Sequence, residues 1–147
     1  DLLITTQCIT LDSDWRSKEE VLKGMTDNLL LASRCRYPRK LEADLWAREA
    51  VFSTGLGFSF AIPHSKSEHI EQSTISVARL KAPVRWGDED AQFIIMLTLN
   101  KHAAGDQHMR IFSRLARRIM HEAFRNALVN AASADAIASL LQHELEL

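Results

Sequence analysis

Two stretches in the first third of the chain repeat their apolar residues with the period of a helix. In SKEEVLKGMTDNLLLASR, Ser17 stands three residues before Glu20, which is the pattern of a capping box. The apolar residues of that stretch recur at helical spacing: Val21, Leu22, Met25, Leu29 and Leu30. The second stretch begins near Pro38, a residue favoured in a first helical turn, and RKLEADLWAREAVF continues it to just before Thr54. We therefore predict two helices ahead of this residue.

After Gly55 the pattern changes from helical to extended. The runs FSFAI, STISVARL and AQFIIMLTL (residues 58–62, 73–80 and 91–99) are short and rich in Ile, Val, Phe and Thr, which predicts strands. The third run is apolar almost throughout, as expected of a central strand that is covered on both faces.

Helical spacing returns after the loop NKHAAGDQ. HMRIFSRLARRIMHEAF (108–124) predicts one helix, and SADAIASLLQHEL predicts a last helix with Ser133 as its N-cap. Helices thus bracket the strands in sequence, and no linker or repeat divides the chain. We predict an α/β fold with a mixed central sheet flanked by helices on both faces, in a single domain over residues 1–147.

Length and charge restrict the classes of partner. A chain of 147 residues is long enough to bury a core of its own. Its 18 basic side chains nearly cancel its 19 acidic ones, which gives no support for a nucleic acid or an anionic membrane as the main partner. No apolar run approaches the roughly 18 residues that span a bilayer, so we expect no direct insertion into a membrane.

The N-terminus and the cysteines indicate a cytoplasmic protein. DLLITTQCIT has no basic region and no cleavage pattern of a secretion signal, and it lacks a starting Met, which suggests a domain of a longer chain. Cys8 and Cys35 stand far apart and form no CxxC pair. We expect reduced thiols with a structural role, in neither a disulfide nor a zinc site.

Arg48 is the first of three residues that interrupt the local pattern. It falls on the apolar stripe of the second predicted helix, three residues after Leu45 and four before Phe52. An unpaired buried charge is costly, so the guanidinium should meet a carboxylate, a phosphate or the edge of the core. The alternative, which the spacing alone favours, is a structural ion pair or a side chain that extends to solvent.

His64 is the second residue that interrupts the local pattern. Pro63 removes a backbone donor and fixes its own φ angle, which stiffens the approach to the histidine. The end of a strand followed by a loop is where α/β sheets commonly place their chemistry. A neutral imidazole there could act as a nucleophile or a base, whereas a histidine of an ordinary surface loop would have no role.

His108 is the third residue that interrupts the local pattern. With Asp106 as the N-cap, His108 would lie in the first turn of the following helix, where free N–H groups and the helix dipole favour an anion. A solvent-facing histidine is the alternative. If His108, His64 and Arg48 come together in the fold, two imidazoles, a guanidinium and a helix N-terminus would surround a bound phosphate.

The sequence WAREAVFSTGLGFSFAIPHSK, followed later by GDQHMRIFSRLARRI, resembles the mannitol/fructose-type enzyme IIA domains of the bacterial sugar phosphotransferase system. The family pattern is an Arg-Glu pair at a helix end, Ser-Thr-Gly, a second glycine, Ala-Ile-Pro-His, and a second histidine ahead of a helix that contains Leu-Ala. SKEEVL also fits the first helix of the family, so the resemblance extends over essentially the whole chain.

The resemblance implies a role for each of the three residues. His64 would accept a phosphoryl group from the phosphohistidine of the carrier HPr and pass it to a cysteine of an enzyme IIB domain. His108 would orient the phosphoryl group and Arg48 would balance its charge, while Glu49 would be structural. The chemistry needs no cofactor and no metal. Ser65, where the family often has glycine, and Ser59-Phe60, where Gly-Ile is commoner, put the choice of substrate and partner in question.

Three alternatives stay open. The same fold and phosphohistidine occur in regulatory modules, namely nitrogen-related enzyme IIA proteins and domains attached to transcription regulators, where phosphorylation is a signal. A metal-dependent hydrolase would use His64, His69, His102 and His108, although their spacing matches no standard ligand set. Nucleic-acid binding would use the basic helix RIFSRLARRIMHEAFR, without support from the overall charge.

Overall fold

The computed structural model describes residues 2–103 and 107–147, apart from the side chains of Gln107 and His108. Within these residues, six strands and five helices follow one another in the order β1 (Ile4–Ser13), α1 (Lys18–Leu31), α2 (Pro38–Val51), β2 (Gly55–Gly57), β3 (Phe60–Ala61), β4 (His64–Ser67), β5 (Thr74–Trp86), β6 (Glu89–Asn100), α3 (Gln107–Ile119), α4 (Glu122–Val129) and α5 (Ala134–Glu144).

The strands form one mixed sheet, as predicted. Its order is β1-β5-β6-β3-β2, and β4 also pairs with β6. β1 lies parallel to β5, β5 and β6 are antiparallel, and both β3 and β4 run parallel to β6. β6 is therefore the central strand, with β5 on one side and β3 followed by β4 on the other.

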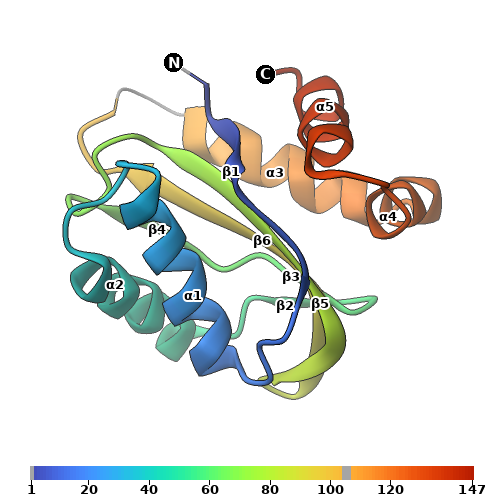
Figure 1. Ribbon diagram of the computed structural model, residues 1–147, viewed down its shortest axis with the longest axis horizontal. Coiled ribbons are helices and arrows are strands. Elements are labelled where there is room, and N and C mark those ends of the chain that lie inside the picture. Colours follow the sequence, from blue (N-terminus) through green and yellow to red (C-terminus); the bar gives the residue numbers. More distant parts are fainter. Residues whose placement is uncertain (1, 104–106) are drawn as a thin grey trace.

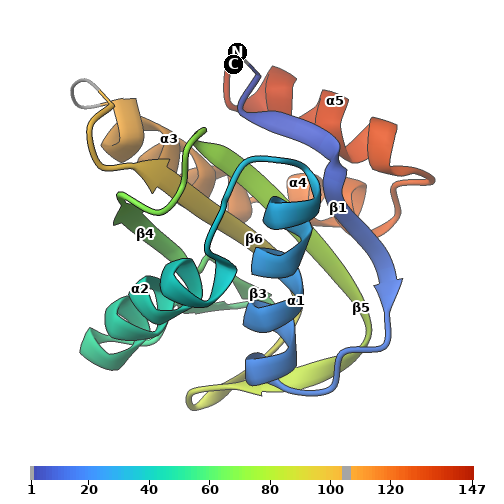
Figure 2. The ribbon, with the colours of Figure 1, turned by 60° about the vertical axis from the view of Figure 1, so that its left-hand side comes forward.

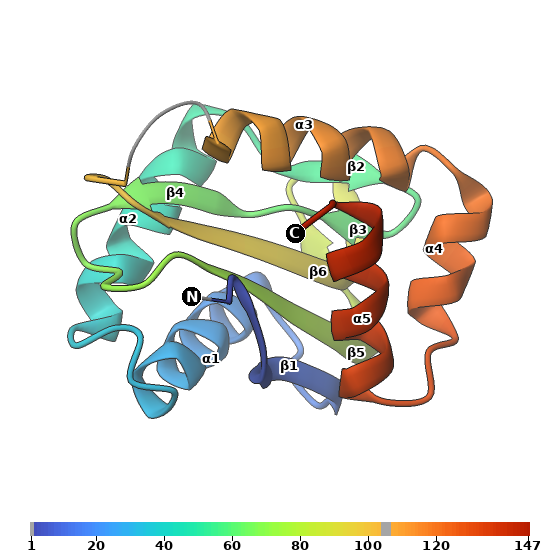
Figure 3. The same cartoon turned by 90° about the horizontal axis from the view of Figure 1, so that it is seen from above.

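Helices cover both faces of the sheet, which confirms the predicted architecture (Figures 1 and 3). α1 and α2 pack on one face around Leu22, Leu45 and Trp86, and α3, α4 and α5 pack on the other around Leu115 and Leu141. Alternate side chains of β6 enter the two cores, as the period of a strand requires. Both faces of β6 are thus buried, in agreement with its apolar sequence.

The ends of three helices agree with their sequence signals. The Ser17 hydroxyl accepts a hydrogen bond from the Glu20 N–H at 3.1 Å, and Pro38 opens α2. The Ser133 hydroxyl accepts one from the Ala136 N–H, also at 3.1 Å. Each cap satisfies a donor that the first helical turn leaves free, which fixes where the helix begins.

The sequence prediction was incomplete in two places. Strands β1, β2 and β4 were not predicted, and the single helix expected over 108–124 is divided into α3 and α4. The division falls at Met120 and His121, where the Arg125 guanidinium donates a hydrogen bond to the Ile119 carbonyl at 2.6 Å. This contact satisfies a carbonyl at the C-terminus of α3.

Two expectations based on composition can also be compared with the structure. Cys8 and Cys35 are buried and free, as predicted, and burial raises the pKa of both thiols. None of the helices in the described ranges is both long enough and apolar enough to cross a bilayer.

Two leucines of α1 provide a matched test of the core. Leu29 is completely buried, whereas Leu31 is 80% exposed. Leu29→Ala is expected to lower the free energy of unfolding by about 2–5 kcal/mol, because it removes buried methyl groups and leaves a cavity. Leu31→Ala should change it by less than about 0.5 kcal/mol. Urea denaturation of both variants measures the difference, and equal losses would contradict this packing of α1.

Candidate functional site

His64 is positioned by the central strand of the sheet. Phe60 of β3 pairs with Phe93 of β6, and His64 of β4 pairs with Leu97, so the register against β6 is the same on both sides of Ile62-Pro63. The Pro63 carbonyl accepts a hydrogen bond from the Leu97 N–H at 2.9 Å. The loop expected after His64 is thus a short strand, and the histidine begins it.

The contacts of the His64 ring define its protonation state. Nδ1 lies 2.8 Å from the Ile62 carbonyl oxygen, and Nε2 lies 3.3 Å from Nε of Arg48. A carbonyl can only accept and a guanidinium can only donate, so Nδ1 bears the proton and Nε2 presents its lone pair. The ring is therefore neutral, with the nitrogen nearest to Arg48 available as a nucleophile.

The surroundings of His64 favour this neutral form. Burial lowers the pKa of His64 below the ordinary value of histidine, and the nearby charge of Arg48 lowers it further. The hydrogen bond to the Ile62 carbonyl and the charge of Glu49 oppose this effect without cancelling it. Nε2 is consequently unprotonated at neutral pH.

A titration of His64 followed by NMR is expected to show a midpoint below about 6.5, the value of an unperturbed histidine. In urea the midpoint should return to that value, because the burial is lost. Because the pKa is lower in the folded protein, His64 should reduce stability as the pH falls below about 6.5 toward that lower pKa. A midpoint above that of the unfolded chain would contradict the geometry.

Arg48 lies in the last turn of α2, beside the histidine. Besides its contact with His64, its guanidinium donates a hydrogen bond to the Phe52 carbonyl at 2.7 Å. The expected partners were a carboxylate, a phosphate or the edge of the core, whereas the observed ones are an imidazole nitrogen and a main-chain carbonyl. The predicted apolar stripe is correct at Leu45, which is fully buried, and wrong at Phe52, which is 74% exposed.

Phe112 of α3 completes the surroundings of the ring. Its centroid lies 4.6 Å from that of His64, with a tilt of 53° between the planes. α2 and α3 belong to opposite helical layers, and β4 runs between them (Figures 2 and 3). His64, the first residue of β4, therefore lies at an edge of the sheet, in contact with Arg48 of one layer and Phe112 of the other. Sequence reasoning missed Phe112, although its place one helical turn after His108 was a usable signal.

His108 lies on the first turn of α3, as the sequence predicted. Asp106, the expected N-cap, and the side chain of His108 are outside the described residues. The structure therefore brings together two of the three predicted site residues, Arg48 and His64.

The turn before β3 contains Ser59, one of the departures from the family pattern noted in the sequence. Phe58 and Ser59 connect β2 to β3, and both have positive φ angles, of 58° and 66°. Such a two-residue turn favours glycine, and Ser59 adopts this conformation at a position where the resemblance leads one to expect glycine. Phe60 is 2% exposed and stacks on Phe93 with 4.9 Å between the ring centroids, so it belongs to the core.

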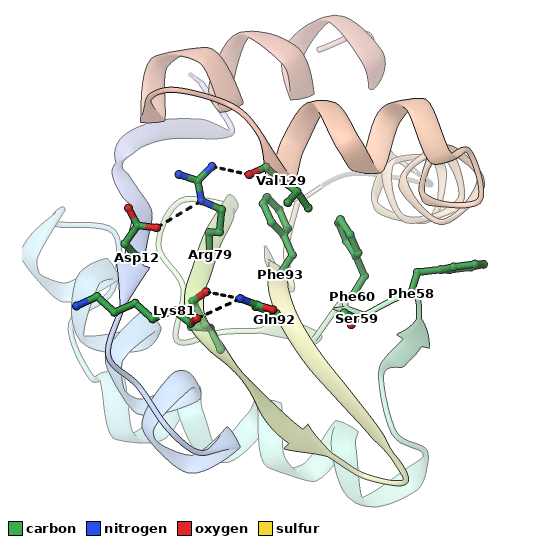
Figure 4. Close-up of a pocket in the computed structure, with 10 residues that line it drawn as sticks. Asp12, Phe58, Ser59, Phe60, Arg79, Lys81, Gln92, Phe93 and Val129 are labelled. Carbon is green, nitrogen blue, oxygen red and sulfur yellow. Dashed lines mark hydrogen bonds and ion pairs between the residues drawn. The ribbon is translucent and has the colours of Figure 1, made fainter.

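Two hollows in the surface differ in their relation to this site. One of ≈ 510 Å³ lies beside Arg48, and its lining includes Ser65, Lys66 and Lys101. Another of ≈ 540 Å³ is lined by Phe58, Phe60, Phe93 and Arg79, and includes neither Arg48 nor His64 (Figure 4). In the second, Arg79 is already bonded to the Val129 and Ala131 carbonyls, at 3.1 and 2.8 Å. We therefore take the His64 edge as the functional site.

Potential metal ligands are scattered over the fold. In the part of the chain that the structure describes, no three side chains of His, Cys, Asp or Glu are grouped so that they could hold an ion.

Comparison with known proteins identifies the family of the chain. The family model for the phosphoenolpyruvate-dependent sugar phosphotransferase system, EIIA 2, matches residues 2–144. Multiphosphoryl transfer protein 2 of Escherichia coli (strain K12) is 94% identical over 145 residues, which are 99% of this chain and 17% of that protein. The chain thus spans about a sixth of the length of this relative.

Solved structures share the fold. Nitrogen regulatory protein IIA-Ntr from Neisseria meningitidis has a TM-score of 0.84 and 25% identity, covering 95% of this chain and 96% of that one. Enzyme IIAMTL from Escherichia coli, solved in complex with phosphorylated enzyme IIBMTL, has a TM-score of 0.78 and 20% identity, covering 96% and 99%. Because the family model matches residues 2–144, nearly all of the chain, the chain belongs to the EIIA 2 family of the phosphoenolpyruvate-dependent sugar phosphotransferase system.

Proposed function

We propose that His64 is the residue through which this phosphotransferase domain accepts and passes on a phosphoryl group. The observation that supports the proposal best is the state of the ring: Nδ1 is held by the Ile62 carbonyl at 2.8 Å, and Nε2 faces Arg48 with a free lone pair. A nucleophile of this kind requires both an unprotonated nitrogen and a fixed direction of approach.

The transfer can proceed without moving a proton. The Nε2 lone pair forms the new N–P bond while the N–P bond of the donor phosphohistidine breaks, and that electron pair returns to the donor ring. Nδ1 keeps its proton and its hydrogen bond to Ile62 throughout, which supports the positive charge that the phosphorylated ring acquires. Positioning and charge stabilisation supply the catalysis, so the step needs no metal and no cofactor.

Arg48 has the charge that the transferred group requires. Its guanidinium now contacts Nε2, so the incoming phosphorus would displace it from the lone pair and the N–H groups would turn to the phosphoryl oxygens. The Phe52 carbonyl, which accepts from the same guanidinium at 2.7 Å, would keep the side chain nearby. His108, in the first turn of α3, would orient the phosphoryl group from the other helical layer.

The partners follow from this chemistry. The donor would be the phosphohistidine of HPr and the acceptor a cysteine of an enzyme IIB domain, by analogy with enzyme IIAMTL, which was solved in complex with phosphorylated enzyme IIBMTL. The buried free thiols Cys8 and Cys35 fit the reducing cytoplasm, where we place the exchange. Sugar uptake would then depend on this domain as a phosphoryl carrier.

The experiment is incubation with phosphoenolpyruvate, enzyme I and HPr, followed by addition of an enzyme IIB domain. We expect one acid-labile phosphate on the protein, which then appears on the cysteine of enzyme IIB. Acceptance without onward transfer would instead favour a regulatory phosphohistidine, as the likeness to nitrogen regulatory protein IIA-Ntr would suggest. No incorporation at all would refute the proposal.

A further inference from the structure

A largely buried ion pair, which the transfer step described above does not use, connects α1 with α2 near the site. Lys18 Nζ lies 2.8 Å from the Glu49 carboxylate, and the two side chains are 14% and 3% exposed. The ammonium also faces the rings of Trp46 and Trp86, 5.5 and 5.0 Å from their centroids. Burying two charges costs free energy that their attraction often fails to recover, so stability alone is a weak reason for the pair.

The carboxylate of this pair binds both the main chain and the side chain of Thr54, in the segment between α2 and β2. Glu49 accepts hydrogen bonds from the N–H of Thr54, at 3.2 Å, and from its hydroxyl. The indole N–H of Trp86 donates to the same hydroxyl at 3.1 Å. Glu49 and Thr54 are 8% and 5% exposed, so little water competes for these bonds.

Thr54 is in turn bonded to the residue that holds His64. The Ile62 N–H donates to the Thr54 carbonyl at 3.0 Å, and the Ile62 carbonyl accepts from Nδ1 of His64 at 2.8 Å. Hydrogen bonds, together with the main chain of Thr54 and Ile62, therefore connect Lys18, at the start of α1, with the imidazole at the edge of the sheet.

We propose that Lys18, Glu49 and Thr54 are positioning residues that fix the tautomer of His64. By holding the peptide of Thr54, the ion pair keeps the Ile62 carbonyl where it receives the proton of Nδ1, and Nε2 is left free for phosphorus. This inference rests on the proposed function of His64. Without the ion pair, the Ile62 carbonyl would shift and the ring would distribute its proton over both nitrogens, as a histidine does in water.

The test compares His64 in the wild type and in the double variant Lys18→Met/Glu49→Gln, which removes both charges with little change of volume. Nitrogen NMR of the neutral ring is expected to show the proton on Nδ1 alone in the wild type and on both nitrogens in the variant. The rate of phosphoryl acceptance from HPr should fall about tenfold or more, since small misplacements at a reacting atom have effects up to about a hundredfold.

A matched control is Lys81→Met/Asp14→Asn, which removes an ion pair of 3.0 Å whose side chains are 60% and 77% exposed. It should leave the tautomer and the rate as in the wild type. A single Nδ1–H tautomer in a folded Lys18→Met/Glu49→Gln protein overturns the inference, even if acceptance is slower. An equal tautomer change in the control overturns it too.

Two further outcomes remain decisive. If the double variant does not fold, Lys18→Met alone removes the ammonium that holds the Glu49 carboxylate, and an unchanged tautomer in that variant overturns the inference. If the wild type takes up no phosphate, the proposed function fails, while the tautomer comparison still decides whether the ion pair positions the ring.

Discussion

Replacing His64 with glutamine is expected to abolish phosphorylation of the protein by phospho-HPr. The amide of glutamine could still donate to the Ile62 carbonyl, but its nitrogen lone pair is delocalised and cannot attack phosphorus. Mass spectrometry should show the gain of one acid-labile phosphate in the wild type and none in the variant. Because His64 is only half-buried, the fold should persist, which circular dichroism would establish.

The control for this experiment is His143→Gln. His143 lies in the last turn of α5, in a helix that packs on the face opposite to α2, so this variant should be phosphorylated at His64 as the wild type is. Equal labelling of His64→Gln and the wild type would mean that another residue is the acceptor.

Replacing Arg48 with methionine is expected to slow phosphoryl acceptance by about 10²–10³-fold, the range observed when one preorganised donor to a developing charge is removed. Methionine fills the space of the arginine stem but offers no hydrogen bond to the phosphoryl oxygens. The same change removes a positive charge that lowers the pKa of His64, so that pKa should rise toward the ordinary value. Rapid-quench kinetics and an NMR titration measure the two effects separately.

Arg48→Lys is the informative companion variant. Lysine restores the charge without the Nε contact to His64 or the planar fork, so it should recover the lowered pKa of His64 better than the rate. A methionine variant that accepts phosphate at the wild-type rate would exclude Arg48 from the transfer.

The elements that the sequence predicted well are those with local signals. Ser17 and Ser133 mark helix starts through a hydrogen bond within the first turn, and Pro38 marks one through its fixed φ angle. All three signals are local, so short stretches of sequence suffice to find them. β6 was found because an apolar run of that length requires burial on both faces.

The missed strands depend on partners distant in sequence. β4 reads HSKS, which is polar, and it is a strand because β6 provides the pairing. β2 reads GLG, and its pairing with β3 crosses a turn without an Asn-Gly signal. In β1, a register shift between Ile4 and Ile9 interrupts the alternation that would have identified a strand.

The division between α3 and α4 is a third example. Met120 and His121 include neither Gly nor Pro, and His121 makes no side-chain cap. The break is supported by the contact between Arg125 and the Ile119 carbonyl, in which a side chain replaces a helical hydrogen bond. Continuous helical spacing gave no indication of it.

Local sequence signals also predicted the site only in part. Arg48 and His64 were identified individually, because one interrupts an apolar stripe and the other follows a proline. Their contact, across 16 residues, exists because α2 packs beside β4, which is a property of the tertiary structure. The bonds of Glu49 to Lys18 and Thr54 were not predicted for the same reason.

The register of β3 and β4 against β6 is unchanged across Pro63, and this affects how quickly a bound donor protein can transfer its phosphoryl group. Because the main chain is paired on both sides of the proline, little conformational freedom remains to be lost at the acceptor when a donor protein arrives. A short-lived encounter can then be productive, since only the visiting phosphoryl group still has to find its alignment.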